Sequence, residues 1–317
     1  MSRMEKKEIR HRGRFSQVFI YLGKLFRMFI FQNDWKVLPM AAIIAGLVCF
    51  VVGANIFKTM EGTKLGSFAM ACICIWNGFF NSIQVICRER AIVKREHRSG
   101  LHISSYIHAH MIYQAFLCLC QTLITLVVCR ASNVSFPEKS LITPWPLVDI
   151  GITLFLVTYC ADMMALMVSA LVRSTTTAMT VMPFLLIFQL VFSGGFFSLS
   201  GTAVRITDLT IAKWGLVALC TQGDYNSLPM VSLWNTLLKL QGVEVGDNKP
   251  VEQALRYLQD NDMRDDIHMW ASKYNQEPAY AFDPGNVLKC WGFLILYILV
   301  YSSVAMVSLE FIDKDKR

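Results

Sequence analysis

The sequence predicts an all-α polytopic membrane protein, and three observations lead to that fold class. The chain of 317 residues is 54% hydrophobic and 17% charged, whereas soluble domains carry about 25% charged residues. Its mean hydropathy is +0.43. Several uncharged runs are long enough to cross about 30 Å of hydrocarbon, and one short, strongly charged segment lies between two of them. We therefore expect six transmembrane helices, preceded by an N-terminal interfacial helix, with a large external loop between spans five and six.

Residues 1–36 are expected to form a basic cytoplasmic tail and an interfacial connecting helix. The tail is rich in lysine and arginine. After it, large apolar residues recur at alternating spacings of four and three, namely Phe15, Phe19, Leu22, Phe26 and Phe29. That spacing is typical of an amphipathic helix lying in the plane of the membrane interface. The helix either only anchors the chain or also touches a cytoplasmic partner.

The transmembrane domain is predicted to extend over residues 37–317. Runs of about 18 or more apolar residues are candidate membrane spans. The long connection at residues 200–286 is polar and holds two helix candidates of its own, at 250–260 and 262–274. The six spans are expected at about 37–57, 65–87, 107–129, 148–172, 175–199 and 287–309.

Basic residues set the expected orientation in the membrane. They concentrate in the N-terminal tail, in the segment between spans two and three, and at the C-terminus, while the first and third connections carry few. Cytoplasmic loops carry the excess of lysine and arginine in membrane proteins. We therefore expect an integral protein of the plasma (inner) membrane, with both termini in the cytoplasm and the 200–286 loop outside.

The segment at residues 88–104 is the most informative feature of the sequence. Arginine and glutamate residues are concentrated there between two uncharged runs. Charged side chains near hydrocarbon are costly in free energy unless they lie in water. We expect a coupling loop at the cytoplasmic membrane face, where a charged segment suits binding another protein. The residues expected to do so are Arg88, Glu89, Arg90, Arg95 and Glu96.

Asp162 is the only carboxylate deep inside a predicted span. A buried charge in a span is costly, so such a residue is a functional-site hypothesis by default. It could carry protons, bind a cationic substrate, or act structurally by staying neutral or by accepting a hydrogen bond. We favour the structural role.

Cysteine and histidine predict no metal site. Most of the ten cysteines lie inside the apolar runs, where cysteine acts as a small hydrophobe. An i,i+2 spacing points side chains to different faces of a helix, which disfavours chelation. The pairs with this spacing are Cys72 with Cys74, Cys118 with Cys120, and His108 with His110.

Two groups of short motifs accompany the spans. The first group, between spans two and three, comprises Glu89-Arg90, Arg95-Glu96, Gly100-Leu101 and Tyr106. The second group follows span five and comprises Phe192-Ser-Gly194, Phe196, Trp214 and Ala218-Leu219. Together they resemble the membrane domains of ABC type-2 exporters, especially the G-subfamily (White and pleiotropic drug resistance) pattern. Val217 stands where that pattern has a glutamate.

The resemblance implies a half-exporter membrane domain that dimerises, as a homodimer or a heterodimer, and is driven by ABC ATP-binding domains. The chain has no Gly-x-x-x-x-Gly-Lys-Ser/Thr phosphate loop, so it is not expected to be an enzyme. No cofactor is expected on this chain, and ATP and magnesium would be bound by the partner ATPase domain, either separately encoded or fused upstream. Membrane lipid is an expected partner and nucleic acid is not.

The resemblance also implies a place for a substrate cavity, because the G-subfamily builds its central cavity from the second and fifth spans of both protomers. In span two, a single helical stripe carries amides beside an aromatic ring, and in span five a group beside Pro183 could supply the opposite wall. The alternative for the amides is hydrogen bonding between helices. The expected cavity residues are Asn77, Phe80, Asn81, Gln84, Phe184, Phe188, Gln189 and Phe192.

The expected function is export of an amphipathic, lipid-like, peptide or drug-like substrate by alternating access in an ATP-driven dimer. Two other classes of protein stay open at this point. An ion-coupled carrier would use Asp162. A membrane-embedded enzyme would need a constellation of His, Asp or Glu side chains at one depth.

Overall fold

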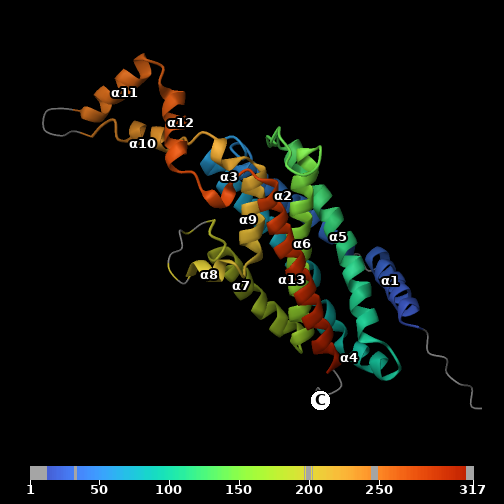
Figure 1. The fold of residues 1–317 in the computed structure, drawn as a ribbon. Coiled ribbons are helices and arrows are strands. Elements are labelled where there is room, and N and C mark those ends of the chain that lie inside the picture. The colour runs from blue at the N-terminus through green and yellow to red at the C-terminus, as the bar shows by residue number, and fades with distance from the viewer. Residues whose placement is uncertain are drawn as a thin grey trace, which may run out of the picture.

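The protein folds into a long helical bundle, seen in a computed structural model (Figure 1). The described residues form helices and contain no strand, which confirms the predicted all-α class. Residues 1–12 of the expected tail and interfacial helix, the motif residue Phe196 and the C-terminal residues 312–317 lie outside the described residues. The structure describes residues 13–31, 34–195, 197, 201, 203–243 and 249–311.

Four helical stretches of the described chain are long and apolar enough to cross a membrane. Two further apolar helices, α2 (Val37–Val52) and α7 (Thr175–Val191), have 16 and 17 residues, fewer than the about 20 that an upright span needs. The structure therefore has four full-length candidate spans in its described part, where the sequence predicts six. These four are α3 with α4 (Met60–Arg98), α5 (Ile103–Ala131), α6 (Pro146–Leu171) and α13 (Pro284–Glu310).

The central helix of the bundle is α6. It packs along α3 (Met60–Ser82) and along α13, and most of its residues are buried. At Gly78, α3 and α6 approach very closely: a Cβ atom there would lie 2.4 Å from the carbonyl oxygen of Thr158 and 2.7 Å from the main-chain nitrogen of Asp162. A larger residue would have to displace the backbone of α6.

The helix α1 (Arg14–Phe31) is the predicted amphipathic helix, and it lies alongside part of α5 (Figure 1). Leu25 is buried in this contact, and the ring of Phe26 meets the ring of Tyr113 edge-on at 5.7 Å. Phe15, from the same predicted stripe, is exposed. The buried side of α1 therefore covers only part of the expected stripe, because contact with α5 determines which side chains are buried.

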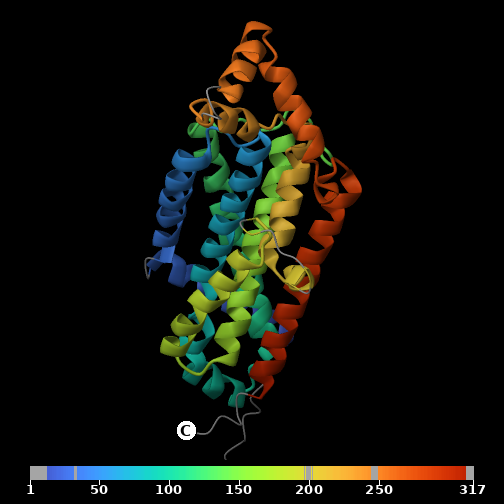
Figure 2. The ribbon, with the colours of Figure 1, turned by 90° about the vertical axis from the view of Figure 1, so that its left-hand side faces the viewer.

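Helix α7 covers Thr175–Val191 of the predicted fifth span at 175–199, and a separate short helix follows it in the bundle. After α7 ends at Val191, the chain forms α8 (Ala203–Thr207) and then enters the bundle as α9 (Ile211–Gln222), which packs against α3, α6 and α13. In Figure 2 the gold α9 lies above the yellow-green α7. The sequence places α9 in the external 200–286 stretch, yet most of it is buried. With 12 residues, α9 is too short to be recognised as a span.

A helical cap covers the end of the bundle opposite α4 (Val85–Arg98), as Figures 1 and 2 show. Side chains of α3 hold it: Glu61 Oε1 accepts a hydrogen bond from the main-chain nitrogen of Ser232 at 2.8 Å, and Lys64 pairs with Glu277 at 2.6 Å. Both helices expected within the long connection are present. The cap contains η2 (Tyr225–Ser227), α10 (Ser232–Lys239), α11 (Pro250–Asp260), α12 (Arg264–Tyr274) and η3 (Pro278–Tyr280), and a similar turn, η1 (Asp34–Lys36), precedes α2.

Replacing Gly78 by alanine is expected to lower the free energy of unfolding by about 1 to 3 kcal/mol, the usual cost of overpacking a close contact. Gly292 of α13 is the matched control, because a Cβ atom there meets nothing within 4 Å. Gly292→Ala should leave stability equal or slightly higher, since alanine is the better helix former. Thermal unfolding in detergent compares the two variants, and equal midpoints would contradict the close approach of α3 and α6.

Candidate functional site

The charged segment at 88–104 begins within a helix, α4, that is anchored to the end of α6. The main-chain nitrogens of Ile86 and Cys87 both donate to the hydroxyl oxygen of Ser169, at 3.0 and 3.1 Å. The first N–H groups of a helix have no partner within that helix. The Ser169 hydroxyl therefore caps α4 from a neighbouring helix and fixes the start of α4 against α6.

Arg90 makes a second link between α4 and α6. Its Nη1 donates to the carbonyl oxygen of Ala170 at 2.7 Å and to that of Val172 at 3.2 Å. The last carbonyl groups of a helix lack partners within it and carry a partial negative charge. The Arg90 guanidinium therefore satisfies the C-terminal end of α6, and α4 and α6 are joined at two points.

The two predicted coupling glutamates turn toward α1. Glu89 Oε2 lies 3.3 Å from Lys24 Nζ, and Glu96 accepts a hydrogen bond from the Tyr21 hydroxyl. Burial, and then the Glu96 carboxylate, raise the pKa of Tyr21 above its usual value, so this hydroxyl keeps its proton and remains a donor. Both glutamates therefore bind α1 to α4.

The helix α1 also holds the turn that follows α4. The Gln17 side chain donates to the carbonyl oxygen of Gly100 at 3.1 Å and accepts from the main-chain nitrogen of His102 at 2.9 Å. The Ser105 hydroxyl donates to the carbonyl oxygen of Arg14 at 3.0 Å. Gly100 has a φ angle of 102°, a left-handed conformation that favours glycine. As a result, α1, α4 and the start of α5 form one hydrogen-bonded unit.

One face of α4, which we name the α4 outer face, is exposed. Its exposed residues recur at spacings that place them on a single side of the helix. Of the five predicted coupling residues, only Arg88 and Arg95 lie on this face, whereas the other three bind α1 or α6. The face is basic with a small apolar centre and comprises Arg88, Ala91, Ile92, Arg95, Arg98 and Ser99.

The predicted cavity stripe of α3 is divided between buried and exposed positions. Asn77 is buried and Phe80 is 50% exposed, while Gln84 lies in the turn between α3 and α4. Asn81 and Gln121 of α5 exchange two hydrogen bonds, at 2.9 and 3.0 Å. Paired amides inside a membrane bundle hold helices together, so Asn81 links α3 to α5.

The predicted cavity residues in and directly after α7 also include both exposed and buried side chains. Phe184 is 70% exposed, and the rings of Phe188 and Phe192 lie 5.0 Å apart. Gln189 is buried, and its Oε1 accepts from the first two N–H groups of α9, beginning with Ile211, at 2.8 and 3.2 Å. These N–H groups lack partners within α9, so Gln189 caps a helix that begins inside the bundle.

An apolar pocket of about 190 Å³ lies between α3 and α7. Of the eight predicted cavity residues, only Gln189 is among the residues that line it. Within one chain, the structure therefore does not gather the predicted α3 and α7 residues around a single cavity. The pocket is lined by Cys72, Ile75, Trp76, Pro183, Leu186, Ile187, Gln189 and Leu190.

Asp162 lies in a polar cluster inside the bundle. Its Oδ2 accepts from the thiol of Cys118 at 3.4 Å, and the same sulfur lies 3.8 Å from Asn81 Nδ2. Since Asn81 also pairs with Gln121, the cluster joins α3, α5 and α6. Among the described residues, the buried Oδ1 has no hydrogen-bond partner, so the structural role of Asp162 stays a prediction.

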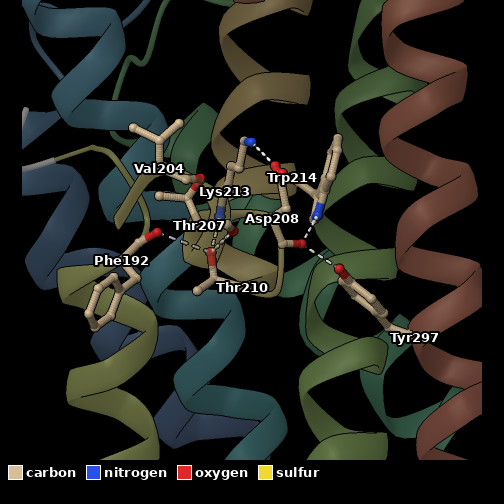
Figure 3. A network of polar contacts seen from close by, with 8 residues as sticks. All are labelled: Phe192, Val204, Thr207, Asp208, Thr210, Lys213, Trp214 and Tyr297. Carbon is tan, nitrogen blue, oxygen red and sulfur yellow. Dashed lines mark hydrogen bonds and ion pairs between the residues drawn. The ribbon is translucent and has the colours of Figure 1, made fainter. Parts of the chain in front are cut away.

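A network that the sequence did not reveal fixes the turn between α8 and α9 (Figure 3). The carbonyl oxygen of Asp208 accepts from Trp214 Nε1 at 2.9 Å and from the Tyr297 hydroxyl of α13, and its carboxylate pairs with Lys213. The Thr210 hydroxyl donates to the carbonyl oxygen of the residue that follows α7, at 3.3 Å. The motif residue Trp214 therefore ties α9 to α13. Tyr297 and Asp208 are 89 positions apart, so no local pattern connects them.

Two comparisons place the chain among known proteins. A family model described as ABC-2 type transporter matches residues 17–219, from α1 to α9. The ABC transporter ATP-binding/permease protein Rv1747 of Mycobacterium tuberculosis (strain ATCC 25618 / H37Rv) is 25% identical over 152 residues. That alignment covers 47% of this chain and 18% of the length of the relative.

Replacing Gln189 by leucine is expected to lower stability by about 1 to 3 kcal/mol for each N–H group of α9 left without an acceptor. Phe184→Leu, at an exposed position of the same helix, is the control and should change the free energy of unfolding by less than about 0.5 kcal/mol. Thermal unfolding in detergent measures both. A Gln189→Leu protein as stable as the control would show that Gln189 does not cap α9.

Proposed function

Because the chain belongs to the ABC-2 type transporter family, as its motifs indicate, we propose that it is the membrane subunit of an ATP-driven exporter. The family and the long apolar helices support an integral membrane permease of an ABC transporter. The subunit works in a dimer, homomeric or heteromeric, by alternating access. It carries an amphipathic, lipid-like, peptide or drug-like substrate out of the cell.

The α4 outer face is the observation that carries this proposal. It presents Arg88 and Arg95 with Ile92 between them, while α1 and α6 hold the opposite side of the helix. A basic surface held in place suits docking to an ABC ATP-binding domain whose facing surface is acidic. A displacement of α4 would reach α6, the central helix, through the contacts of Arg90 and Ser169.

ATP and magnesium belong to that partner domain. Binding of nucleotide by two such domains would favour one of two conformations, because a ligand shifts an equilibrium by its difference in affinity for the two states. The relative from Mycobacterium tuberculosis is named as an ATP-binding/permease protein. For the present chain, the partner domain is either fused or a separate polypeptide, and both arrangements place it against α4.

The membrane domain crosses the bilayer six times, with both termini in the cytoplasm. The 16 residues of α2 extend about 24 Å, and local thinning of the bilayer accommodates a short helix. The crossing that begins with α7 is continued by α9, since irregular backbone at membrane depth is tolerated where protein surrounds it. The cap of α10, α11 and α12 then lies outside the cell.

Exposed aromatic rings on α3 and α7 support a substrate cavity between two protomers. Trp76 and Phe80 stack with their ring centroids 6.3 Å apart. In the single chain both rings are about half exposed, and Phe184 is more exposed still. Aromatic surface with a few amides is typical of pockets for small apolar molecules. A second protomer would close such a cavity from the other side.

Reversing charge on the α4 outer face, by Arg95→Glu, is expected to uncouple ATP hydrolysis from transport. Loss of about 1.4 kcal/mol of docking free energy corresponds to about tenfold in affinity, and the part of the ATPase activity that substrate stimulates should fall. Lys58→Glu, an exposed reversal at the other end of the bundle, is the control. The activity is measured with the copurified ATP-binding domain in liposomes, and an unchanged Arg95→Glu activity would contradict the coupling role.

Two neighbouring phenylalanines of α3 separate packing from substrate contact. Phe79 is 0% exposed and Phe80 is 50% exposed. Phe79→Ala should cost about 3 to 5 kcal/mol of stability, as for a buried phenylalanine. Phe80→Ala should leave the unfolding midpoint nearly unchanged and alter substrate preference. If Phe80→Ala transports every substrate as the wild type does, the cavity does not include this face of α3.

A further inference from the structure

Two of the ten cysteines meet across the contact between α2 and α5. Cys49 and Cys129 are 80 positions apart in the chain, and their Sγ atoms are 3.2 Å apart. Both side chains are buried, at 7% and 0% exposure. Non-bonded carbon atoms rest about 3.5 to 4.0 Å apart, so the two larger sulfur atoms are closer than an ordinary contact.

The buried side of α2 consists of small residues. The buried residues of α2 are Ala41, Ala45 and Cys49, one on every fourth position, and Gly53 continues the row beyond the helix. A Cβ atom on Gly53 would lie 3.1 Å from Cγ2 of Val134, which follows α5. Small residues at this spacing allow two helix backbones to approach closely, and a disulfide needs that close approach.

We propose that Cys49 and Cys129 form a reversible disulfide that joins α2 to α5. The thiolate of one cysteine attacks a donor disulfide of the thiol oxidoreductase class and releases one donor thiol. The second cysteine then displaces the other donor sulfur. Two protons and two electrons pass from the cysteine pair to the donor, which leaves as two thiols, and one sulfur–sulfur bond forms in the protein.

The position of the pair determines what the bond does. Cys49 lies in the last turn of α2 and Cys129 near the end of α5. Helix α4 lies at the end of the bundle opposite the cap (Figure 1). At the other end of α5, α1 already packs against Tyr113. The disulfide therefore joins the α1–α2 segment to α5 at both ends, so that these three helices move as one body.

The test uses membranes that contain the full chain, with dipyridyl disulfide as the donor. After treatment, the protein is denatured, alkylated, digested and examined by mass spectrometry. We expect a peptide that links Cys49 to Cys129, and loss of alkylation at these two positions until a reductant is added. The oxidised protein should also melt at a higher temperature in detergent, since a cross-link restricts the unfolded chain.

Two substitutions make the result specific. In Cys49→Ser, no linked peptide should form, because Cys129 either stays a thiol or keeps a pyridylthio group that no second cysteine displaces. The reductant-sensitive part of the melting temperature should disappear. Cys120→Ser, elsewhere on α5, should keep both the linked peptide and the shift. Full alkylation of Cys49 and Cys129 in the treated wild type, or a pyridylthio group retained on either, would overturn the proposal. The test requires neither ATP nor a substrate, so its outcome is independent of the proposed transport activity.

Discussion

Every backbone N–H and C=O group within a bilayer must find its partner inside the protein, and side chains of this chain supply such partners at three helix ends in the bundle. Ser169 caps the start of α4, Arg90 satisfies the end of α6, and Gln189 caps the start of α9. At each of these points a helix begins or ends inside the bundle, and the side chain provides a hydrogen-bond partner for main-chain N–H or C=O groups of that helix. The start of α9 inside the bundle, and the placement of α4 at the bundle end, both depend on them.

The same contacts determine which helices can move together. Close packing at Gly78 joins α3 to α6, and the caps join α4 to α6. Polar contacts from Lys24 and Gln17 add α1 to α4 and to the turn after it. A force applied at the α4 outer face therefore acts on the centre of the bundle, which is what a subunit driven by an external ATPase requires.

The sequence predicted the features that depend on local composition. Hydropathy predicted the all-α membrane fold, the spacing of aromatic residues predicted α1, and the pooled charge predicted a segment at one end of the bundle. The directions in which the charged side chains of α4 point were not predictable. A charge pattern does not show that Glu89 and Glu96 face α1 while Arg95 is exposed. The role of Gln189 was also not predictable from the sequence. An amide in an apolar run is compatible with lining a cavity and with capping a helix, and the N–H groups it caps lie 22 and 23 positions later in the chain.

Site-specific photocross-linking from the α4 outer face tests the central claim most directly. A photoreactive residue at Ile92, which is 41% exposed, is activated in native membranes, and the product is identified by mass spectrometry. The account predicts a cross-link to a protein that carries an ATP-binding P-loop, with none from the same residue placed at Lys58 at the opposite end of the bundle. Cross-links from Ile92 to lipid alone, or equal yields of the P-loop protein from both positions, would contradict docking of an ATPase on α4.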